Sequence, residues 1–354
     1  MRRVCIIGAS GVIGGELLRL LLNHGNVEVV CATSRKFAGE FIYRIHPNLR
    51  GFTTLRFIQP TMDGILKTEP DAVFLALPHG ESVKWVPKII ENGLLAVDLS
   101  ADFRLKNPED YVKWYHWPQP HPYPDLLKAA VYGLPELHRE EIKGARIIAV
   151  PGCMATASIV ALAPAVKERL VNQDFIVVDA KIASSGAGAE GTVLDYHWHR
   201  THVVRPYQPV NHRHTAEIEQ ELSLIAGGPV NVAFTPHAVD MVRGIFITGH
   251  AKLTRSVSEV DLWKAYRGLY GNERFIRIVK DKAGLAHYPS VKYVVGTNLV
   301  DVGFELDQRL NRLVVFSAID NLIRGAAGQA IQSFNIAQGF PEDEGLRYIA
   351  PYPM

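Results

Sequence analysis

The first 150 residues alternate short apolar runs with longer segments of mixed polarity. Apolar runs bounded by turn residues are typical of buried strands, and the segments between them are long enough for helices. Strand and helix in regular alternation indicate a doubly wound α/β fold. The predicted strands cover 4–7, 27–32, 72–77, 94–99 and 146–150, and the predicted helices cover 16–22, 62–67 and 81–92.

The pattern changes after residue 153, where strand-like runs follow one another with few helical segments between them. Such a run indicates an α+β domain with a mainly antiparallel sheet. After an Ala-rich helix over 155–170, strands are predicted over 175–183, 230–235, 244–253, 275–279, 299–306 and 312–319. We therefore expect two domains, one made of 1–152 and 321–354 and the other over 153–320.

Residues 106–136 are rich in Tyr, Trp, His and Pro. Stacked aromatic side chains can bind single-stranded nucleic acid, but the basic residues that would follow a phosphate backbone are not interleaved here. We expect a packed loop or an interface surface.

Composition excludes several classes of function. The 38 basic and 36 acidic side chains of the 354-residue chain give a formal charge of +2, too small to attract nucleic acid or a membrane surface. No segment offers the roughly 18 uninterrupted apolar residues of a membrane helix. Cys5, Cys31 and Cys153 are widely spaced and odd in number, which favours a reducing compartment, the cytoplasm, over a disulfide framework.

A glycine-rich turn lies between the first strand and the first helix. Its Gly-x-x-Gly-x-x-Gly spacing is a variant of the dinucleotide fingerprint, in which glycines permit a tight turn and close approach of a pyrophosphate. The pattern alone is weak evidence, but its position between strand and helix favours nucleotide binding. The expected contacts are Gly8, Ser10, Gly11, Val12, Ile13 and Gly14.

The end of the second strand indicates which dinucleotide binds. An NAD enzyme usually has an acidic residue about 20 residues beyond the fingerprint, where it binds the ribose hydroxyls. Here Ser34, Arg35 and Lys36 occupy that place and suit a 2′-phosphate, so we expect NADP(H). A solvated surface turn is the alternative. Pro78 follows the third strand, where such sheets bind ligands.

Polar residues also follow the fourth strand, in the run Asp98-Leu99-Ser100-Ala101-Asp102-Phe103-Arg104. Two interpretations stay open for Arg104, namely binding of an anionic substrate or phosphate and a structural ion pair with Asp102. Ser100 is a candidate for the same substrate site.

Cys153 is the candidate nucleophile. It follows Pro151-Gly152 and precedes the Ala-rich helix, whose free N–H groups and positive dipole end favour a thiolate. A cysteine in apolar surroundings is more often a packing residue. The role of Cys153 therefore depends on partners elsewhere in the chain.

Five of the 14 histidines lie between residues 195 and 222. We expect no metal site, because paired cysteines and a His-Glu-x-x-His pattern are missing and nearby arginines would repel a cation. His212-Arg213-His214 stands instead at the entrance of a helix over 217–222, with Thr215 as its N-cap or in its first turn. A histidine there can accept the thiol proton and later supply one, and Arg213 suits a carboxylate or phosphate. Surface histidines in a polar loop are the alternative.

Asn321 stands at the start of a helical segment rich in small residues that runs through Ala337. We expect this helix to bring Asn321 toward the nicotinamide, although helix packing alone also explains the small residues.

Six ordered motifs resemble those of the N-acetyl-γ-glutamyl-phosphate reductases. They span nearly the whole chain, and the set is far more specific than any one member. The motifs are Gly8-x-x-Gly11-x-x-Gly14, Asp98 to Arg104, Pro151-Gly152-Cys153, His212-Arg213-His214-Thr215, Phe234 to His237 with Met241 to Gly244, and Asp320-Asn321-Leu322 with Gly325 to Gln329.

The resemblance implies a fold and a reaction. The fold is an NADP-binding Rossmann domain joined to a glyceraldehyde-3-phosphate-dehydrogenase-like catalytic domain, and the reaction reduces an acyl phosphate to a semialdehyde. Cys153 would form a thioester and His214 would be general acid and base, with His212 in reserve. Near the substrate or its phosphate we expect Ser100, Arg104, Ser184, His212 and Arg213, and near the cofactor Ser185, Gly186 and Asn321.

Two departures from the family pattern refine the substrate. Met154-Ala155-Thr156 replaces the usual Tyr-Pro-Thr, and the His-rich stretch near 195–205 is atypical. Both resemble the branch that acts on aminoadipate or glutamate attached to an acidic carrier protein in lysine and arginine biosynthesis. Arg200, Arg205 and Arg213 would suit such a carrier, or hold only the small substrate.

Three alternatives stay open: a reductase of free N-acetyl-glutamyl 5-phosphate, an aspartate-semialdehyde dehydrogenase, and a non-enzymatic NADP-sensing module. We also expect a homo-oligomer, either a dimer or a tetramer.

Overall fold

The structure is a computed structural model that describes residues 1–188 and 191–353. The chain forms two compact units. The first comprises Met1–Pro151 and Ala326–Arg347, and the second comprises Gly152–Gly325 and Tyr348–Met354. The domains expected from the sequence, 1–152 with 321–354 and 153–320, stay a prediction.

The first unit is built on six parallel strands in the order β2-β1-β3-β4-β6-β5. All residues of β3 and β4 are buried, as expected of a parallel sheet that is covered on both faces. The strands are β1 (Arg2–Ile7), β2 (Val27–Ala32), β3 (Ala72–Leu75), β4 (Leu95–Asp98), β5 (Val131–Tyr132) and β6 (Ile147–Ala149).

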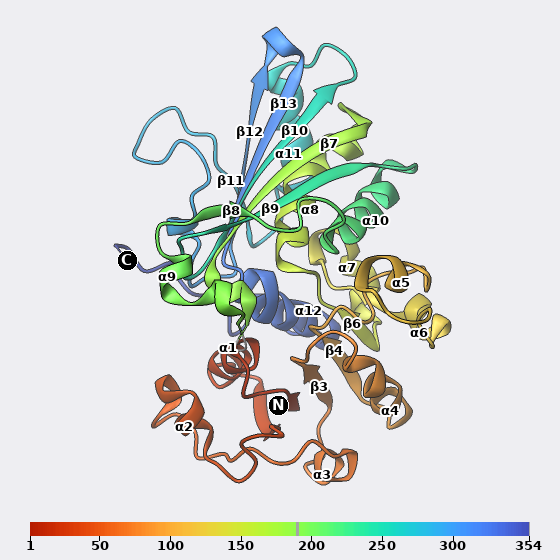
Figure 1. Cartoon of the computed structure of the whole chain (residues 1–354), viewed down its shortest axis with the longest axis vertical. Helices are drawn as coiled ribbons and strands as arrows, with labels where there is room; N and C mark the ends of the chain where they lie inside the picture. Colours follow the sequence, from red (N-terminus) through yellow and green to blue (C-terminus); the bar gives the residue numbers. More distant parts are fainter. Residues whose placement is uncertain (189–190, 354) are drawn as a thin grey trace. The chain divides into compact units, whose positions relative to one another are not determined.

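The strand order reverses between β1 and β3, which makes this a doubly wound sheet and confirms the predicted Rossmann fold. Right-handed crossovers place α1 and α4 on opposite faces of the sheet. The C-terminal helix α12 belongs to this unit, and Figure 1 shows it in blue beside the red helix α1. The helices are α1 (Val12–Leu21), α2 (Ile42–Ile45), α3 (Met62–Leu66), α4 (Val86–Glu91), α5 (Asp110–Tyr115), α6 (Pro124–Ala129), α7 (Pro135–Lys143) and α12 (Gly328–Gln338).

Residues 106–136 contain α5, α6, β5 and the start of α7, so the predicted packed loop was wrong, and the alternative of an interface surface stays a prediction. The signal for two of these helices is proline at the first helical position, where its missing N–H costs no hydrogen bond. Pro124 and Pro135 hold that position in α6 and α7. The aromatic side chains pack on one another, with the rings of Tyr111 and Trp117 centred 5.0 Å apart.

The second unit is built on seven strands in the order β11-β12-β13-β10-β7-β9-β8. The sheet is mainly antiparallel, as predicted, but β7 pairs with β9 and β11 with β12 in parallel. The strands are β7 (Val171–Ile182), β8 (Val204–Pro206), β9 (Val232–Val239), β10 (Ile245–Leu253), β11 (Ile276–Ile278), β12 (Val300–Asp307) and β13 (Arg312–Ile319).

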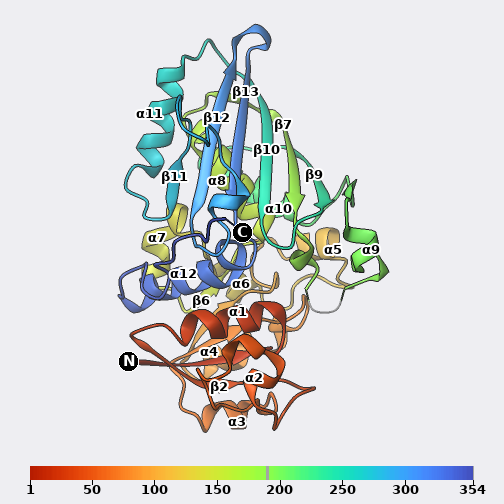
Figure 2. The same ribbon diagram turned by 90° about the vertical axis from the view of Figure 1, so that its left-hand side faces the viewer.

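Helix α8 (Cys153–Lys167) packs on β7, β10, β12 and β13, and α10 (His214–Ala226) and α11 (Glu259–Tyr270) pack beside it (Figure 2). The short helix α9 (His197–Arg200) lies between β7 and β8 in the chain. Burial alternates along β7: Ile176, Val178 and Ala180 are buried, whereas Asp179 and Lys181 are partly exposed. Because successive strand residues point to opposite faces, the helices cover one face of this sheet and leave the other open.

Across the described ranges, no helix is long and apolar enough to cross a membrane.

Candidate active site

Cys153 is the first residue of α8, and Gly152 is the N-cap with an extended backbone. The N–H groups of the first turn therefore have no acceptors within the helix. Cys153 is partly exposed, whereas Met154 and the rest of the helix through Val166 are buried. The candidate nucleophile thus stands at the positive end of a buried helix, which favours its thiolate.

Two glycines leave room around Cys153. A Cβ atom on Gly152 would lie 2.5 Å from Nε2 of His214 and 2.8 Å from Oε1 of Glu217. A Cβ atom on Gly325 would lie 2.6 Å from Cβ of Cys153. Neither position admits a side chain. His214 and Glu217 therefore lie directly against the backbone that precedes the cysteine.

Glu217 joins the two chain segments of the site. Its side chain is fully buried, its Oε2 accepts a hydrogen bond of 2.8 Å from the N–H of Gly152, and its Oε1 lies 4.0 Å from Nε2 of His214. Glu217 was not among the residues predicted from the sequence. Its signal was the spacing His-x-x-Glu, which places both side chains on one face of a helix.

His214 and His212 differ in what their surroundings permit. His214 is the first residue of α10, and its N–H donates to Nδ1 of His212 at 3.2 Å. Burial, with the charge of Arg213, lowers the pKa of His212 to about 3. His212 is therefore neutral near pH 7 and acts as a hydrogen-bond acceptor. Thr215 lies in the first turn of α10, so of the two predicted positions the N-cap one was wrong.

Tyr207 is a second residue that the sequence analysis missed. Its hydroxyl lies 3.9 Å from Sδ of Met154, which adjoins the nucleophile. Burial and the neighbouring Cys153 raise the pKa of Tyr207, so its hydroxyl keeps its proton and can donate a hydrogen bond. No sequence pattern singles out this tyrosine.

Three arginines of the second unit have no carboxylate partner among the described residues. Arg200 donates to the carbonyls of Ile182 and Val239, at 3.4 Å each. Arg205 donates to the carbonyl of Leu194 at 2.9 Å. Nε of Arg213 is buried and has no hydrogen-bond partner within the described part of the chain. Their positive charge is available for an anion.

Of the predicted residues after β7, Asn321 contacts Ser185. Oδ1 of Asn321 accepts from the N–H of Gly244 at 2.7 Å, and Nδ2 donates to Oγ of Ser185 at 3.0 Å. The N–H and Oγ of Ser184 both donate to the carbonyl of Met241. Gly186 packs on Ile182, since a Cβ atom there would lie 2.6 Å from Cδ1 of Ile182.

The first unit carries the glycine turn. Gly8 has a φ of +81°, and a Cβ atom on Gly14 would lie 2.5 Å from the carbonyl oxygen of Gly8. The start of α1 can pack so closely on the turn only because both residues are glycines. The turn presents the free N–H groups of Val12 and Ile13 at the N-terminus of α1, which suits a pyrophosphate. These residues fit a dinucleotide.

The predicted residues after β2 adjoin this turn. Oγ of Ser34 lies 2.9 Å from Oγ of Ser10, and Nη2 of Arg35 lies 2.6 Å from Oε2 of Glu81. Nζ of Lys36 lies 5.3 Å from the ring centre of Phe37. Pro78 precedes Glu81 in the segment that follows β3.

Ser100 and Arg104 are buried in the first unit, in hydrogen bonds of their own. Oγ of Ser100 donates to Oδ2 of Asp98 at 2.9 Å, and Nε of Arg104 donates to the carbonyl of Val150 at 2.7 Å. Burial and the nearby Asp102 raise the pKa of Asp98 to about 7. Both residues brace the ends of β4 and β6, and their contact with substrate stays a prediction.

Among the residues with described positions, no group of three His, Cys, Asp or Glu side chains is placed to hold a metal ion.

Two family models match most of the chain. Residues 3–145 match the NAD binding domain of semialdehyde dehydrogenases, and residues 153–321 match the semialdehyde dehydrogenase dimerisation domain. The NAD-binding match covers the glycine turn, and the other begins at Cys153.

Curated relatives extend over the full chain. A protein of Saccharolobus solfataricus named [LysW]-L-2-aminoadipate/[LysW]-L-glutamate phosphate reductase is 49% identical over 351 residues, which cover 99% of this chain and 98% of the relative. Proteins of Caldivirga maquilingensis and Pyrobaculum aerophilum named for the same reductase are 86% identical over 354 residues and 69% identical over 352 residues. These two matches cover 100% and 99% of this chain, and 100% of each relative. The chain belongs to this reductase family.

Solved structures with the same fold are more distant in sequence. Aspartate semialdehyde dehydrogenase II of Vibrio cholerae has a TM-score of 0.71 at 18% identity, with 96% of this chain and 98% of that chain covered. The Candida albicans aspartate semialdehyde dehydrogenase solved with NADP has a TM-score of 0.65 at 16% identity, with 96% and 98% covered. This chain therefore has the fold of these semialdehyde dehydrogenases.

Membership of the reductase family confirms the predicted family and enzyme class. The chain is an oxidoreductase of the phosphorylating semialdehyde dehydrogenase type and uses a nicotinamide cofactor.

Proposed function

We propose that this chain reduces an acyl phosphate to a semialdehyde with NADPH, on a 2-aminoadipyl or glutamyl group that a carrier protein presents, in lysine and arginine biosynthesis. The observation that carries the proposal is the group of Cys153, His214 and Glu217 around Gly152 at the N-terminus of α8. The name of the Saccharolobus solfataricus relative supports both the acyl phosphate and the carrier.

Cys153 carries the acyl group. Its thiolate attacks the carbonyl carbon, a C–S bond forms, and the C–O bond to phosphate breaks with its electron pair leaving on phosphate. His214 accepts the thiol proton and passes it to the departing phosphate, and one proton enters from solvent in each turnover. A bound nicotinamide cofactor supplies the hydride. The C–S bond then breaks, and Cys153 returns to the thiolate as the semialdehyde leaves.

The preference for NADPH rests on the end of β2. Ser34, Arg35 and Lys36 supply a hydroxyl and two cations, and no acidic residue stands among them. A phosphate monoester carries about two negative charges near pH 7, so cations at this place favour the 2′-phosphate of NADPH over the bare ribose of NADH.

The carrier preference rests on Arg200, Arg205 and Arg213. None pairs with a carboxylate in the described ranges, and Trp198, in the same part of the chain, is 70% exposed. An acidic partner would satisfy these charges, and an exposed aromatic residue is typical of a contact surface.

A phosphate-dependent NADP⁺ reduction assay tests the substrate. We expect carrier-linked semialdehydes to give a kcat/KM at least about tenfold above that of free N-acetylglutamate semialdehyde, and a rate that falls as salt rises. Arg200→Gln with Arg205→Gln should lower kcat/KM for the carrier-linked substrate about tenfold, while Arg255→Gln, at an exposed arginine that follows β10, should not. Equal rates with the free acetylated substrate would contradict the carrier assignment.

We also propose that the open face of the seven-stranded sheet pairs with a second copy of the chain. Phe246 of β10 and Phe316 of β13 stack on each other with ring centres 6.2 Å apart, and both are partly exposed. Phe316→Glu should turn a dimer or tetramer into a smaller species in light scattering, whereas Leu224→Glu, on the outer side of α10, should not.

The predicted cytoplasmic location stays a prediction.

A further inference from the structure

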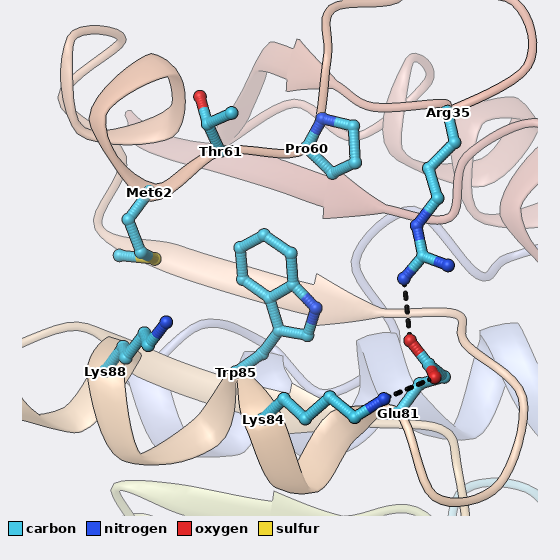
Figure 3. A pocket seen from close by; sticks show the side chains of 8 residues that line it. All are labelled: Arg35, Pro60, Thr61, Met62, Glu81, Lys84, Trp85 and Lys88. Carbon is cyan, nitrogen blue, oxygen red and sulfur yellow. Dashed lines mark hydrogen bonds and ion pairs between the residues drawn. The ribbon is translucent and has the colours of Figure 1, made fainter.

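The first unit contains a pocket of about 380 Å³ beside the end of β2 (Figure 3). This size is within the range of small-molecule sites. Arg35 comes from the segment after β2, and Glu81 comes from the segment after β3. Since ligands of doubly wound sheets bind beyond the carboxyl ends of the strands, the pocket lies where the adenosine end of a dinucleotide is expected. Its lining comprises Arg35, Pro60, Thr61, Met62, Glu81, Lys84, Trp85 and Lys88.

One carboxylate in this pocket binds two cations. Oε2 of Glu81 lies 2.6 Å from Nη2 of Arg35, and Oε1 lies 2.7 Å from Nζ of Lys84. The hydrogen bonds from Lys84 and Arg35 lower the pKa of Glu81, so the carboxyl is ionised at neutral pH. Figure 3 shows the two cationic side chains reaching Glu81 from different directions. Such an anion between an arginine and a lysine has the same partners that a bound phosphate monoester would have.

The two ion pairs are easily exchanged. The side chains of Arg35 and Lys84 are 68% and 64% exposed, so water and salt screen their attraction to Glu81. A phosphate group carries more negative charge than a carboxylate and offers three acceptor oxygens. It can therefore take both cations from Glu81.

The rest of the lining suits a flat ring. Trp85, Pro60 and Met62 form an apolar wall, and in Figure 3 the indole of Trp85 points toward Pro60. Aromatic side chains stack on nucleobases of any kind. A base and a phosphate on one ribose match the two halves of the pocket.

We propose that Glu81 is an internal substitute for the 2′-phosphate of NADPH: it holds Arg35 and Lys84 in place and yields both to the cofactor, and Lys84 and Trp85 complete the adenosine 2′-phosphate site. This inference rests on the NADPH preference proposed above. Glu81 thereby sets how strongly the 2′-phosphate is favoured, because the phosphate must compete with it.

Calorimetric titration with NADP⁺, NAD⁺, adenosine 2′,5′-bisphosphate and 5′-AMP tests the inference without turnover. Glu81→Gln should tighten NADP⁺ and the bisphosphate by about threefold to tenfold and change NAD⁺ and 5′-AMP by less than about twofold. Lys84→Ala should weaken the first two ligands about tenfold. Trp85→Leu should weaken all four.

Two matched variants control for charge. Glu40→Gln removes an exposed carboxylate that pairs with Arg44 at 2.6 Å, and Lys128→Ala removes an exposed lysine that pairs with Asp125 at 3.8 Å and does not line the pocket. Both should change NADP⁺ binding by less than about twofold.

Three other outcomes would contradict either the role of Glu81 or the preference for NADPH. If Glu81→Gln weakens NAD⁺ and leaves NADP⁺ unchanged, Glu81 binds the ribose hydroxyls and the inference is wrong. If Glu81→Gln changes neither ligand while the unmodified chain prefers NADP⁺, only the inference fails. If the unmodified chain prefers NAD⁺, the NADPH assignment fails as well.

Discussion

The cysteines of this chain occupy two kinds of surroundings: Cys153 lies at the start of a helix, whereas Cys5 and Cys31 lie in neighbouring strands. Cys5 lies within β1 with none of its surface exposed, and its register partner in β2 is Cys31. Burial, together with Cys31, raises the pKa of the Cys5 thiol well above its ordinary value. Cys153 instead is partly exposed at the N-terminus of α8.

The difference shows that position within an element decides what a cysteine can do. The backbone N–H groups around a strand interior are used by neighbouring strands, so they cannot stabilise a thiolate. A hydrogen bond with Cys5 lowers the pKa of Cys31, but both thiols are buried away from substrate. A helix N-terminus has N–H groups to spare. At Cys153 a second helix also supplies the imidazole of His214 and the carboxylate of Glu217.

Removing the nucleophile gives the largest expected effect. Cys153→Ala should lower turnover by at least about 10⁴-fold, because no other group can form the thioester, and it should leave cofactor binding unchanged. Steady-state rates and calorimetry measure the two properties. Cys31→Ala is the matched control and should keep most of the activity. Turnover near normal in Cys153→Ala would exclude the thioester mechanism.

The proton carrier should come next. His214→Asn should lower kcat by about 10²-fold to 10⁴-fold. Because the pKa of His212 is about 3, that residue is already neutral above pH 4 and cannot produce a pH-dependent step between pH 5 and 8. His212→Asn, whose amide oxygen can still accept from the N–H of His214, should therefore keep the pH–rate profile. If His212→Asn abolished the pH dependence of the rate and His214→Asn did not, His212 would be the general acid and base in place of His214.

Replacing Glu217 should lower kcat less than replacing His214, because Glu217 acts by holding His214 in place. Glu217→Gln keeps an oxygen for the N–H of Gly152 but loses the charge beside His214, so kcat should fall about tenfold to a hundredfold and the pH–rate profile should move. Glu219→Gln is the control, because Glu219 on the same helix accepts from the N–H of Val232 instead. A purely structural Glu217 would lower stability and leave the pH–rate profile in place.

The strand cysteines should show the smallest effect. Cys5→Ala should cost about 1 kcal/mol in the free energy of unfolding and leave kcat unchanged. In the native enzyme iodoacetamide should label Cys153 fast, and substrate should slow that labelling. Mass spectrometry locates the label. Labelling of Cys5 or Cys31 at a rate similar to Cys153 would contradict the contrast between the two surroundings.

Local signals were enough to predict the glycine turn and Cys153. Both lie where a strand ends and a helix begins, so their surroundings follow from residues close in sequence. The family resemblance added His214. The fold, enzyme class and family were confirmed, while the roles of the individual residues stay predictions.

The sequence did not predict Tyr207, and for Glu217 the spacing from His214 indicates a shared helix face but not the contact with Gly152. The hydrogen bond from Gly152 to Glu217 joins residues 65 positions apart, and tertiary packing alone brings them together. Helix α11 was missed although its signal was local. Ser258 and Asp261 form a capping box at its start, a spacing that marks a helix N-terminus.

The burial of α8 has a consequence for how this enzyme family can change. Every residue from Met154 to Val166 is enclosed, so the sulfur of Cys153 cannot be shifted without rebuilding the centre of the unit. We therefore expect a longer or shorter acyl chain to be accommodated by changes in other segments of the site, such as those after β7 and before α10. On this expectation the sulfur of Cys153 keeps its place while the surrounding segments change.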